Sequence, residues 1–266
     1  MKFQILVLVL FLCGLVSYSS AEQALNLAYQ DSDNFPYQMG DGDKINSDQP
    51  GIAVEQILSM GKRLNLDITL IRVPWKRGLR MLEQGKIDGL FNSSFKEERQ
   101  KYGRYPLLNN KPDKRRRSYS NSYSLFIHKD NDIHWDGNIF SHTNFTVFVP
   151  LGFSVAGDLT NQGVTVTETS RLFKNLKLLN MRRIDAVALL SSSGDAYIRK
   201  YPKDMANVVK LEPPLVHKDY YLILSHQFFE AQSKLSERIW DTMGELRESK
   251  EYSSWFSKYL RDSNGK

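Results

Sequence analysis

Between residues 25 and 91, the spacing of apolar residues switches repeatedly between the period of a strand and that of a helix. Alternation with polar residues is typical of strands, and spacings of three or four are typical of helices. Ala53, Ile57, Met60 and Leu64 give the clearest helical spacing. The order strand, helix, strand, helix, strand predicts parallel pairing with right-handed crossovers. The segments are, in turn, 25–29, 51–64, 67–73, 75–85 and 87–91.

The second half of the chain repeats this alternation, which predicts a second α/β unit. Two extended segments, 122–128 and 220–224, connect the units, and the strongly helical segment 230–260 packs back on the first. We therefore expect two lobes joined by two crossing strands. Lobe one comprises residues 22–124 and 225–266, and lobe two comprises residues 125–224, with a strand at 145–149, a helix after Ser154 and a strand after Ile184.

One short pattern occurs twice, with Asp88 and Asp185 at corresponding positions. In each copy a helix end and a basic turn precede Ile-Asp, an apolar strand and a polar patch, which is Asn92–Ser94 in the first copy and Ser191–Ser193 in the second. Open α/β sheets bind ligands at the carboxyl ends of their strands, so the pattern places both patches at a binding edge. Taken alone, the repeat is equally consistent with chance.

The N-terminus has the three parts of a secretory signal peptide. Lys2 precedes the apolar run 5–16, and small residues lead to Ala21. This predicts a signal peptide over residues 1–21, cleaved after Ala21. Cys13 lies inside the apolar run rather than after a small residue at its end, so we expect no lipid anchor. It is the only cysteine, so the exported chain would have neither a disulfide nor a thiol nucleophile.

The formal net charge is +6, and much of the excess lies in the run Lys111–Arg117. Such clusters occur in nucleic-acid-binding proteins, but an exported protein does not encounter the nucleic acids of the cytoplasm, and we expect no nucleic-acid partner. Two interpretations remain open for the run. It is either a solvated surface loop or a positive surface that attracts an anionic ligand.

Taken in order, the motifs resemble the type II periplasmic solute-binding proteins, in particular the group that binds polar amino acids. The stretch Gly85–Arg99, followed by Tyr105-Pro106, resembles the family's segment of Gly-x-Ile-Asp, an apolar strand, small polar residues and a turn ending in Glu-Arg. Phe35–Tyr37 resembles its aromatic–proline–aromatic loop, and Gly152–Ser154 resembles its Gly-x-Thr turn. The resemblance covers the whole mature chain. It implies an α/β fold of two lobes, each a mostly parallel sheet flanked by helices, joined by a two-strand hinge.

The resemblance also implies a ligand site between the lobes, in which Arg99 holds a carboxylate of the ligand. A guanidinium suits this role because its planar fork donates two parallel hydrogen bonds. Ser154, at a helix start, would add backbone N–H groups, and Trp75 would form a flat wall. The expected ligand-binding residues are Arg99, Trp75, Asp31, Phe35, Tyr37, Asn92, Ser93, Ser94 and Ser154.

One position departs from the family. Its amino-acid binders carry an acid a few positions after the second-lobe aspartate, here Asp185, to pair with the ligand's ammonium. In this chain an apolar strand follows, and the next carboxylate is Asp195. A buried ammonium without a partner is costly. Either the acid comes from elsewhere, with Asp31 and Asp195 as candidates, or the ligand is not an ordinary α-amino acid. Positive charge expected near the cleft from Lys76, Arg77 and the run Arg115–Arg117 favours an anionic or carboxylate-bearing ligand.

Common motifs of exported enzymes are missing from the sequence. Gly152–Gly157 is one residue too long for a Gly-x-Ser-x-Gly nucleophile elbow, and the five histidines show no zinc-ligand spacing. Cyclohexadienyl dehydratases share the fold of the resembled family, but they need acidic groups in lobe two, and residues 186–194 supply none. We expect a binding protein rather than an enzyme, with no catalytic residue, metal or cofactor.

The resemblance finally implies a periplasmic monomer with a partner in the membrane. That partner is either the permease of an ATP-driven (ABC) importer or a membrane sensor. Both would recognise the closed form, so the sequence does not separate them. The expected mechanism is hinge closure, in which the ligand docks on lobe one and lobe two closes over it.

Overall fold

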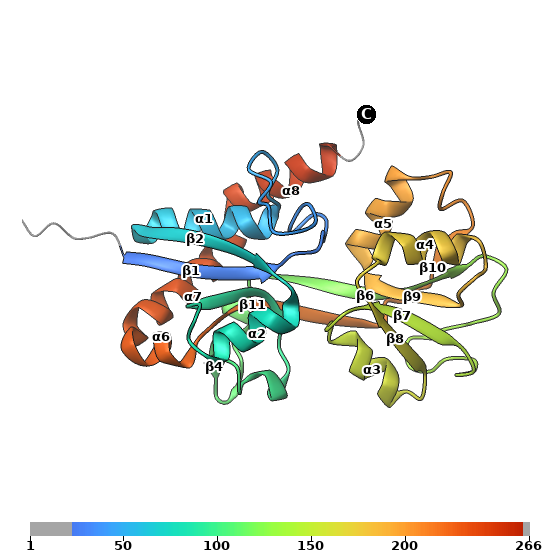
Figure 1. The fold of residues 1–266 in the computed structure, drawn as a ribbon, viewed down its shortest axis with the longest axis horizontal. Helices are drawn as coiled ribbons and strands as arrows, with labels where there is room; N and C mark the ends of the chain where they lie inside the picture. The colour runs from blue at the N-terminus through green and yellow to red at the C-terminus, as the bar shows by residue number, and fades with distance from the viewer. Residues whose placement is uncertain (1–22, 263–266) are drawn as a thin grey trace, which may run out of the picture.

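The computed structural model describes residues 23–262, which form two lobes connected by two long strands (Figure 1). Lobe one contains β1 (Gln23–Gln30), α1 (Ile52–Leu64), β2 (Leu66–Val73), α2 (Trp75–Glu83), β3 (Gly89–Ser94), the 3₁₀ helix η1 (Glu97–Arg99), β4 (Leu107–Leu108), β5 (Lys111–Pro112), the 3₁₀ helix η2 (Lys114–Arg116), α6 (His226–Ala231), α7 (Ser233–Arg247) and α8 (Lys250–Asp262). Lobe two contains β7 (Thr146–Pro150), α3 (Val155–Asn161), β8 (Thr165–Thr169), α4 (Leu172–Asn180), β9 (Ala186–Leu190), α5 (Ser191–Lys200) and β10 (Val208–Lys210). The crossing strands are β6 (Tyr119–His128) and β11 (Val216–Leu224).

Lobe one begins with the predicted strand–helix–strand–helix–strand unit. β1 pairs in parallel with β2 along its length and with β3 on its other side. The predicted apolar face of α1 is buried at Ala53, Ile57 and Met60, and Leu64 packs at its edge. Parallel pairing follows because each crossover helix returns the chain to the same end of the sheet.

The crossing strands join the two lobes into one sheet. β6 and β11 pair antiparallel through residues 119–123 and 216–220. β11 then continues along β3 in lobe one, and β6 continues along β9 in lobe two. The strand order is therefore β2-β1-β3-β11-β6-β9-β7-β8, with the antiparallel pair in the middle (Figure 1).

The two aspartates of the sequence repeat have the same structural role. Asp88 Oδ2 accepts a hydrogen bond from the backbone N–H of Asn26 in β1, at 2.8 Å. Asp185 Oδ2 accepts one from the backbone N–H of Thr146 in β7, at 2.9 Å. Each carboxylate thus ties the chain before one strand to a neighbouring parallel strand, so both aspartates serve the sheet.

The C-terminal segment is three helices, where the sequence pattern predicts one long helical stretch. Ser249 separates α7 from α8: its Oγ donates to the Leu246 carbonyl, and it accepts from the backbone N–H of Tyr252. The predicted apolar face is still present, since Ile239 and Met243 are buried against the sheet. The apolar spacing located the buried face, but it did not locate the break between α7 and α8, where Ser249 caps the start of α8.

The predicted signal peptide lies outside the described residues. Within residues 23–262, no helix has both the length and the apolar character needed to cross a membrane.

Candidate functional site

A cavity of about 180 Å³ lies between the lobes, next to a narrower space of about 20 Å³. The larger compartment includes Asp31 and Asp33, and the smaller one includes Arg99 and Ser154. Residues of both lobes line the two spaces, so we treat them as two ends of one cleft. The residues common to both are Gln30, Asn34, Trp75, Phe153 and Leu190.

Arg99 lies at the point where the lobes touch. It ends η1 and is buried, with 7 % of its surface exposed. Its Nη1 donates to the carbonyl and the Oγ of Ser94, both at 2.9 Å, and its Nη2 donates to the Gly152 carbonyl of lobe two at 3.1 Å. The guanidinium carbon lies 5.3 Å from the centre of the Trp75 ring. Among the described residues no carboxylate forms an ion pair with Arg99, so neutral groups alone hold this buried cation.

Hydroxyl groups continue this contact between the lobes. Ser94 Oγ donates to Ser154 Oγ across the cleft at 3.0 Å, and both serines are buried. Ser154 directly precedes α3, as expected from the sequence. The carboxyl end of β3 and the start of α3 therefore meet at Arg99.

Asn92 has an unusual backbone for a strand residue, with a φ of 63°. Its Nδ2 donates to Gln38 Oε1 at 2.6 Å, and Gln38 in turn donates to the carbonyls of Gln30 and Ser32. Asn92 Oδ1 is buried and has no hydrogen-bond partner in the described part of the chain. Left-handed non-glycine residues and unpaired polar atoms cluster at functional sites, and Asn92 has both features.

Trp75 closes the cleft from lobe one. It begins α2, lines both compartments and packs on Gly152, where an added Cβ would lie 2.8 Å from the ring. Gly152 has a φ of 77°, which glycine adopts without strain. Together these two features explain why the turn before α3 carries a glycine.

Three of the predicted residues support the wall of the cleft and do not line it. Tyr37 is buried and stacks on Tyr119 with 3.8 Å between ring centres. Ser93 is buried and bonds the hydroxyl of Tyr105 at 2.7 Å. The Phe35 ring is half-buried outside the lining, although its carbonyl accepts from Ser193 Oγ of lobe two at 2.9 Å.

Of the two candidate acids, the structure brings Asp31 to the cavity. Asp195 instead forms an ion pair with Lys210 at 2.9 Å and does not line either compartment. Asp33, which the sequence interpretation did not single out, lies beside Asp31 in the larger compartment. No hydrogen bond or ion pair of the Asp31 side chain is found within residues 23–262.

Burial raises the pKa of Asp33 above its usual range, although the backbone N–H of Gly40 donates to its carboxylate at 2.7 Å. A carboxyl with a raised folded-state pKa binds its proton more tightly in the folded chain, so its charged form costs stability at neutral pH. We expect Asp33→Asn to be more stable than the parent at pH 7. The difference in the free energy of unfolding between the two proteins should shrink as the pH falls from the folded-state pKa of Asp33 to its lower unfolded-state pKa.

Urea unfolding of the parent and Asp33→Asn at several pH values measures this difference. Asp43→Asn, at an exposed position nearby, is the control and should show no such trend. A stability difference that widens as the pH falls would contradict the assignment.

Several lining residues escaped the sequence analysis. Ser193 Oγ donates to Asn34 Oδ1 at 2.8 Å and so connects the lobes. Tyr123 and Tyr220 come from the crossing strands and join hydroxyls at 3.0 Å. Ser193 belongs to the second polar patch of the sequence repeat, so the repeat could have been used to predict that it lines the cleft. The two tyrosines could be placed only once the pairing of β6 with β11 was known.

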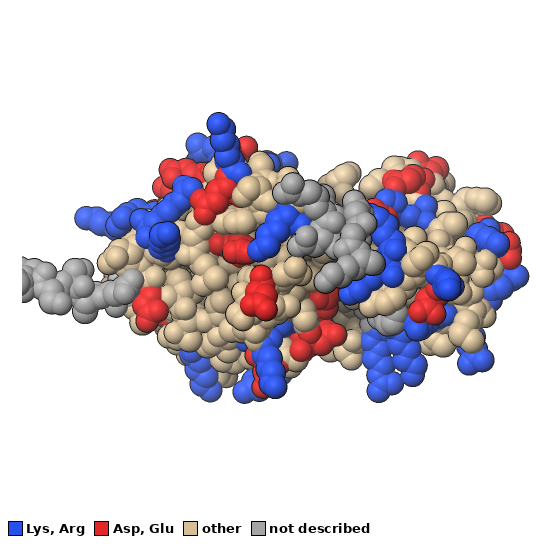
Figure 2. Space-filling model, turned by 90° about the horizontal axis from the view of Figure 1, so that it is seen from above, with Lys and Arg blue, Asp and Glu red and all other residues tan. Residues whose placement is uncertain are grey.

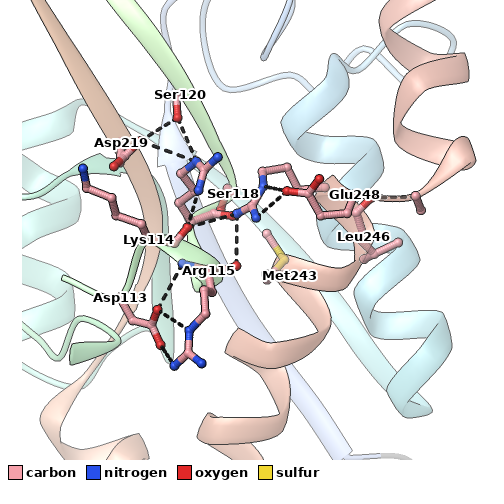
Figure 3. Close-up of polar contacts among 12 residues, drawn as sticks. Asp113, Lys114, Arg115, Ser118, Ser120, Asp219, Met243, Leu246 and Glu248 are labelled. Carbon is pink, nitrogen blue, oxygen red and sulfur yellow. Dashed lines mark hydrogen bonds and ion pairs between the residues drawn. The ribbon is translucent and has the colours of Figure 1, made fainter. Parts of the chain in front are cut away.

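The basic run lies away from the cleft, contrary to the charge expected there. Arg115 pairs with Asp113 at 2.7 Å, and Arg116 pairs with Asp241 of α7 at 2.8 Å. Figure 3 shows this loop beside α7, next to Met243 and Leu246. Arg247 of α7 donates to the backbone carbonyls of the run, which fixes it to lobe one. On the face in Figure 2, Lys and Arg are scattered among Asp and Glu over both lobes.

Ser154→Ala is expected to weaken ligand binding by about 0.5–1.5 kcal/mol, as the loss of one neutral hydrogen bond does. The hydroxyl bridges to Ser94 across the cleft, so its loss removes one contact between the lobes. Titration calorimetry of parent and variant measures the change. A loss of more than about 3 kcal/mol would mean that Ser154 does more than supply a neutral bond.

No group of three or more His, Cys, Asp or Glu side chains within the described ranges is arranged to hold a metal ion. The side chains that meet in the cleft are a guanidinium, carboxylates, amides, hydroxyls and aromatic rings. Such a set of groups offers hydrogen bonds and charges of both signs to a polar molecule.

Comparison with solved structures finds the same two-lobed fold. An arginine-binding protein from T. maritima, solved as a P235GK mutant, superposes with a TM-score of 0.68 at 19% identity, over 90% of this chain and 95% of that chain. The GluR0 ligand-binding core from Nostoc punctiforme, in complex with L-glutamate, gives 0.69 at 17% identity, over 89% and 99%. A histidine kinase sensor domain described as similar to periplasmic binding proteins gives 0.67 at 16% identity, over 89% and 96%.

These likenesses confirm the predicted two-lobed periplasmic-binding-protein fold. Among curated proteins, none matches the sequence of this chain. The sequence profile of the bacterial extracellular solute-binding proteins, family 3, matches residues 28–262. The profile covers both lobes and both crossing strands, and the chain therefore belongs to this family of solute-binding proteins.

Proposed function

We propose that the protein captures a small carboxylate-bearing molecule in the cleft between its lobes, with Arg99 as the group that holds the carboxylate. The observation that carries this proposal is the buried Arg99 guanidinium, which has only neutral partners among the described residues. A buried charge is costly unless it is paired. A ligand carboxylate would pair it and accept from a planar fork of donors that suits its geometry.

Capture requires the cleft to open and close. Hydrogen bonds, an ion pair and the packing of Trp75 on Gly152 hold the lobes together, and a ligand that touches both lobes favours the closed arrangement by its differential contacts. Opening would separate Arg99 from Gly152 and Ser94 from Ser154, and would free the cavity mouth. The crossing strands β6 and β11 supply the bending point in this mechanism. The polar contacts between the lobes include Arg99–Gly152, Ser94–Ser154, Ser193–Asn34, Ser193–Phe35 and Lys76–Glu168.

The family consists of extracellular binding proteins, so ligand capture would take place outside the cytoplasm. We propose that the protein then delivers the ligand to the permease of an ABC-type importer. A second role is ligand sensing for a membrane receptor, and the likeness to a histidine kinase sensor domain favours it as the alternative. A pull-down of the ligand-loaded protein from membranes separates the two. Recovery of a permease supports delivery, and recovery of a receptor kinase supports sensing.

Nothing in this proposal calls for catalysis, and the family and its structural neighbours are binding proteins. Incubation of the protein with each ligand it binds, followed by mass spectrometry, tests the point. We expect the ligand to be recovered unchanged.

A thermal-shift screen tests binding itself. The purified protein, stripped of co-purified ligand by unfolding and refolding, is screened against amino acids, carboxylates without an amine, polyamines, nucleosides and short peptides. A ligand at 100 times its dissociation constant adds about 2.7 kcal/mol, enough to raise the melting temperature by a few degrees. We expect hits only among carboxylates. Hits confined to ligands without a carboxylate would contradict the proposal.

A further inference from the structure

The two ends of the cleft differ in charge. The smaller compartment holds Arg99 among amides, hydroxyls and aromatic rings. The larger compartment holds Asp31 and Asp33. The residues described as lining the cleft thus place a positive group at one end and two carboxylates at the other.

Leu190 lies where these two ends join. It closes β9, is 1 % exposed and lines both compartments. A ligand whose carboxylate lies on Arg99 would present its adjacent carbon to this region. An ammonium on that carbon would lie among Leu190 and the other residues common to both compartments, which are Gln30, Asn34, Trp75 and Phe153; none of these is a carboxylate that could neutralise the charge.

One neutral oxygen near Arg99 is free to accept a hydrogen bond from the ligand. Asn92 Oδ1 is buried and unpaired within the described chain. A neutral amide oxygen can accept a single hydrogen bond, for example from a hydroxyl or an amide. It does not balance a full positive charge in a site that already contains the Arg99 guanidinium.

The larger compartment is suited to a cation. The Asp31 side chain has no described partner, and Trp75 also lines this compartment. Carboxylates and aromatic faces both attract ammonium and guanidinium groups. Leu189, Leu190 and Phe153 supply the apolar surface that an alkyl chain between the two charged ends would contact.

From this charge distribution we infer that the ligand is an ω-amino or ω-guanidino carboxylic acid, with its cation at the end distant from the carboxylate and without an ammonium on the α-carbon. The inference rests on the proposed function, since it takes the carboxylate of the ligand to lie on Arg99. It adds the ligand class: Asp31, helped by Asp33, receives the distant cation, and Leu190 disfavours α-amino acids.

Titration calorimetry with two matched series tests the inference. The guanidino series is 5-guanidinopentanoate, arginine and agmatine, and the amino series is 6-aminohexanoate, lysine and cadaverine. Within each series, the first compound lacks only the α-ammonium of the second, and the third lacks only the carboxylate of the second. We expect the first compound of at least one series to bind about tenfold or more tightly than the second, because only the second places a charge beside Leu190.

The outcomes separate the inference from the proposed function. Equal or tighter binding of arginine and lysine overturns the inference and leaves the capture of carboxylates intact. Tightest binding of agmatine and cadaverine overturns both. If none of the six compounds binds, while a carboxylate without a cation is a hit in the thermal screen, the distant cation is wrong and the proposed function stands.

Two variants locate the effect in the chain. Leu190→Asp is expected to shift the preference about tenfold or more towards the α-amino acid, and Leu190→Asn is the neutral control of the same shape. Asp31→Asn is expected to weaken 5-guanidinopentanoate about tenfold and to leave pentanoate unchanged. Unchanged ratios in folded variants, as judged by their melting temperatures, overturn the inference. If Leu190→Asp does not fold, the parent ligand series and Asp31→Asn still decide it.

Discussion

Replacing Arg99 with alanine is expected to weaken the binding of a carboxylate ligand by about 2–5 kcal/mol, because it removes one partner of a buried charge pair. Arg99 is 7 % exposed, and the acceptors described for its guanidinium are neutral oxygens of Ser94 and Gly152. In the variant the ligand carboxylate would be left in the cleft without a counter-charge. The fork geometry should also matter, so we expect Arg99→Lys to recover only part of the loss.

Titration calorimetry at fixed ionic strength measures this loss. Arg80→Ala is a matched control, since Arg80 lies on the exposed side of α2 and lines neither compartment. We expect the control to bind like the parent. A folded Arg99→Ala protein with the affinity of the parent would remove Arg99 from the site.

Gly244→Ala is expected to lower the free energy of unfolding by about 1–3 kcal/mol, as overpacking of a tight contact does. Gly244 lies within α7, where a glycine-to-alanine change usually stabilises a helix by about 1 kcal/mol. Here an added Cβ would lie 2.3 Å from the backbone carbonyl oxygen of Arg115. The loop cannot easily retreat, because Arg247 holds the Arg115 and Arg117 carbonyls against the same helix.

Urea unfolding compares this variant with Gly157→Ala. Gly157 also lies within a helix, α3, but its added Cβ would meet only the flexible end of Lys96 at 3.1 Å. We expect this control to be as stable as the parent or more stable. If both variants gain stability equally, then the contact between α7 and the basic run is loose.

The parts of the fold that follow from local pattern were predictable. The apolar spacing located α1, β2 and α2, because each element buries one face and its sequence must alternate accordingly. Arg99 could be singled out because the stretch Gly85–Arg99 resembles a family segment that ends in Glu-Arg. The break between α7 and α8 was missed because a single serine cap sets it, and apolar spacing continues across the break.

The site was less predictable, because long-range packing decides which face of a segment meets the cleft. Phe35 and Tyr37 were expected to contact the ligand, but neither lines the cleft, and the Tyr37 ring stacks on Tyr119 in the core. The positive charge of the run Lys111–Arg117 was visible in the sequence, but its partners Glu237 and Asp241 are more than a hundred residues away. Asp31 and Asp195 were equal candidates until Lys210 was found beside Asp195.

A crystal structure of the protein with the tightest-binding compound from the ligand series is the most direct test of the central claim. We predict that the ligand lies between the lobes, with its carboxylate oxygens within hydrogen-bond distance of the Arg99 guanidinium. Ser154 should lie on the same side of the carboxylate, and the cationic end should point towards Asp31. A ligand bound outside the cleft, or a carboxylate held by another cation such as Lys218, would contradict the account.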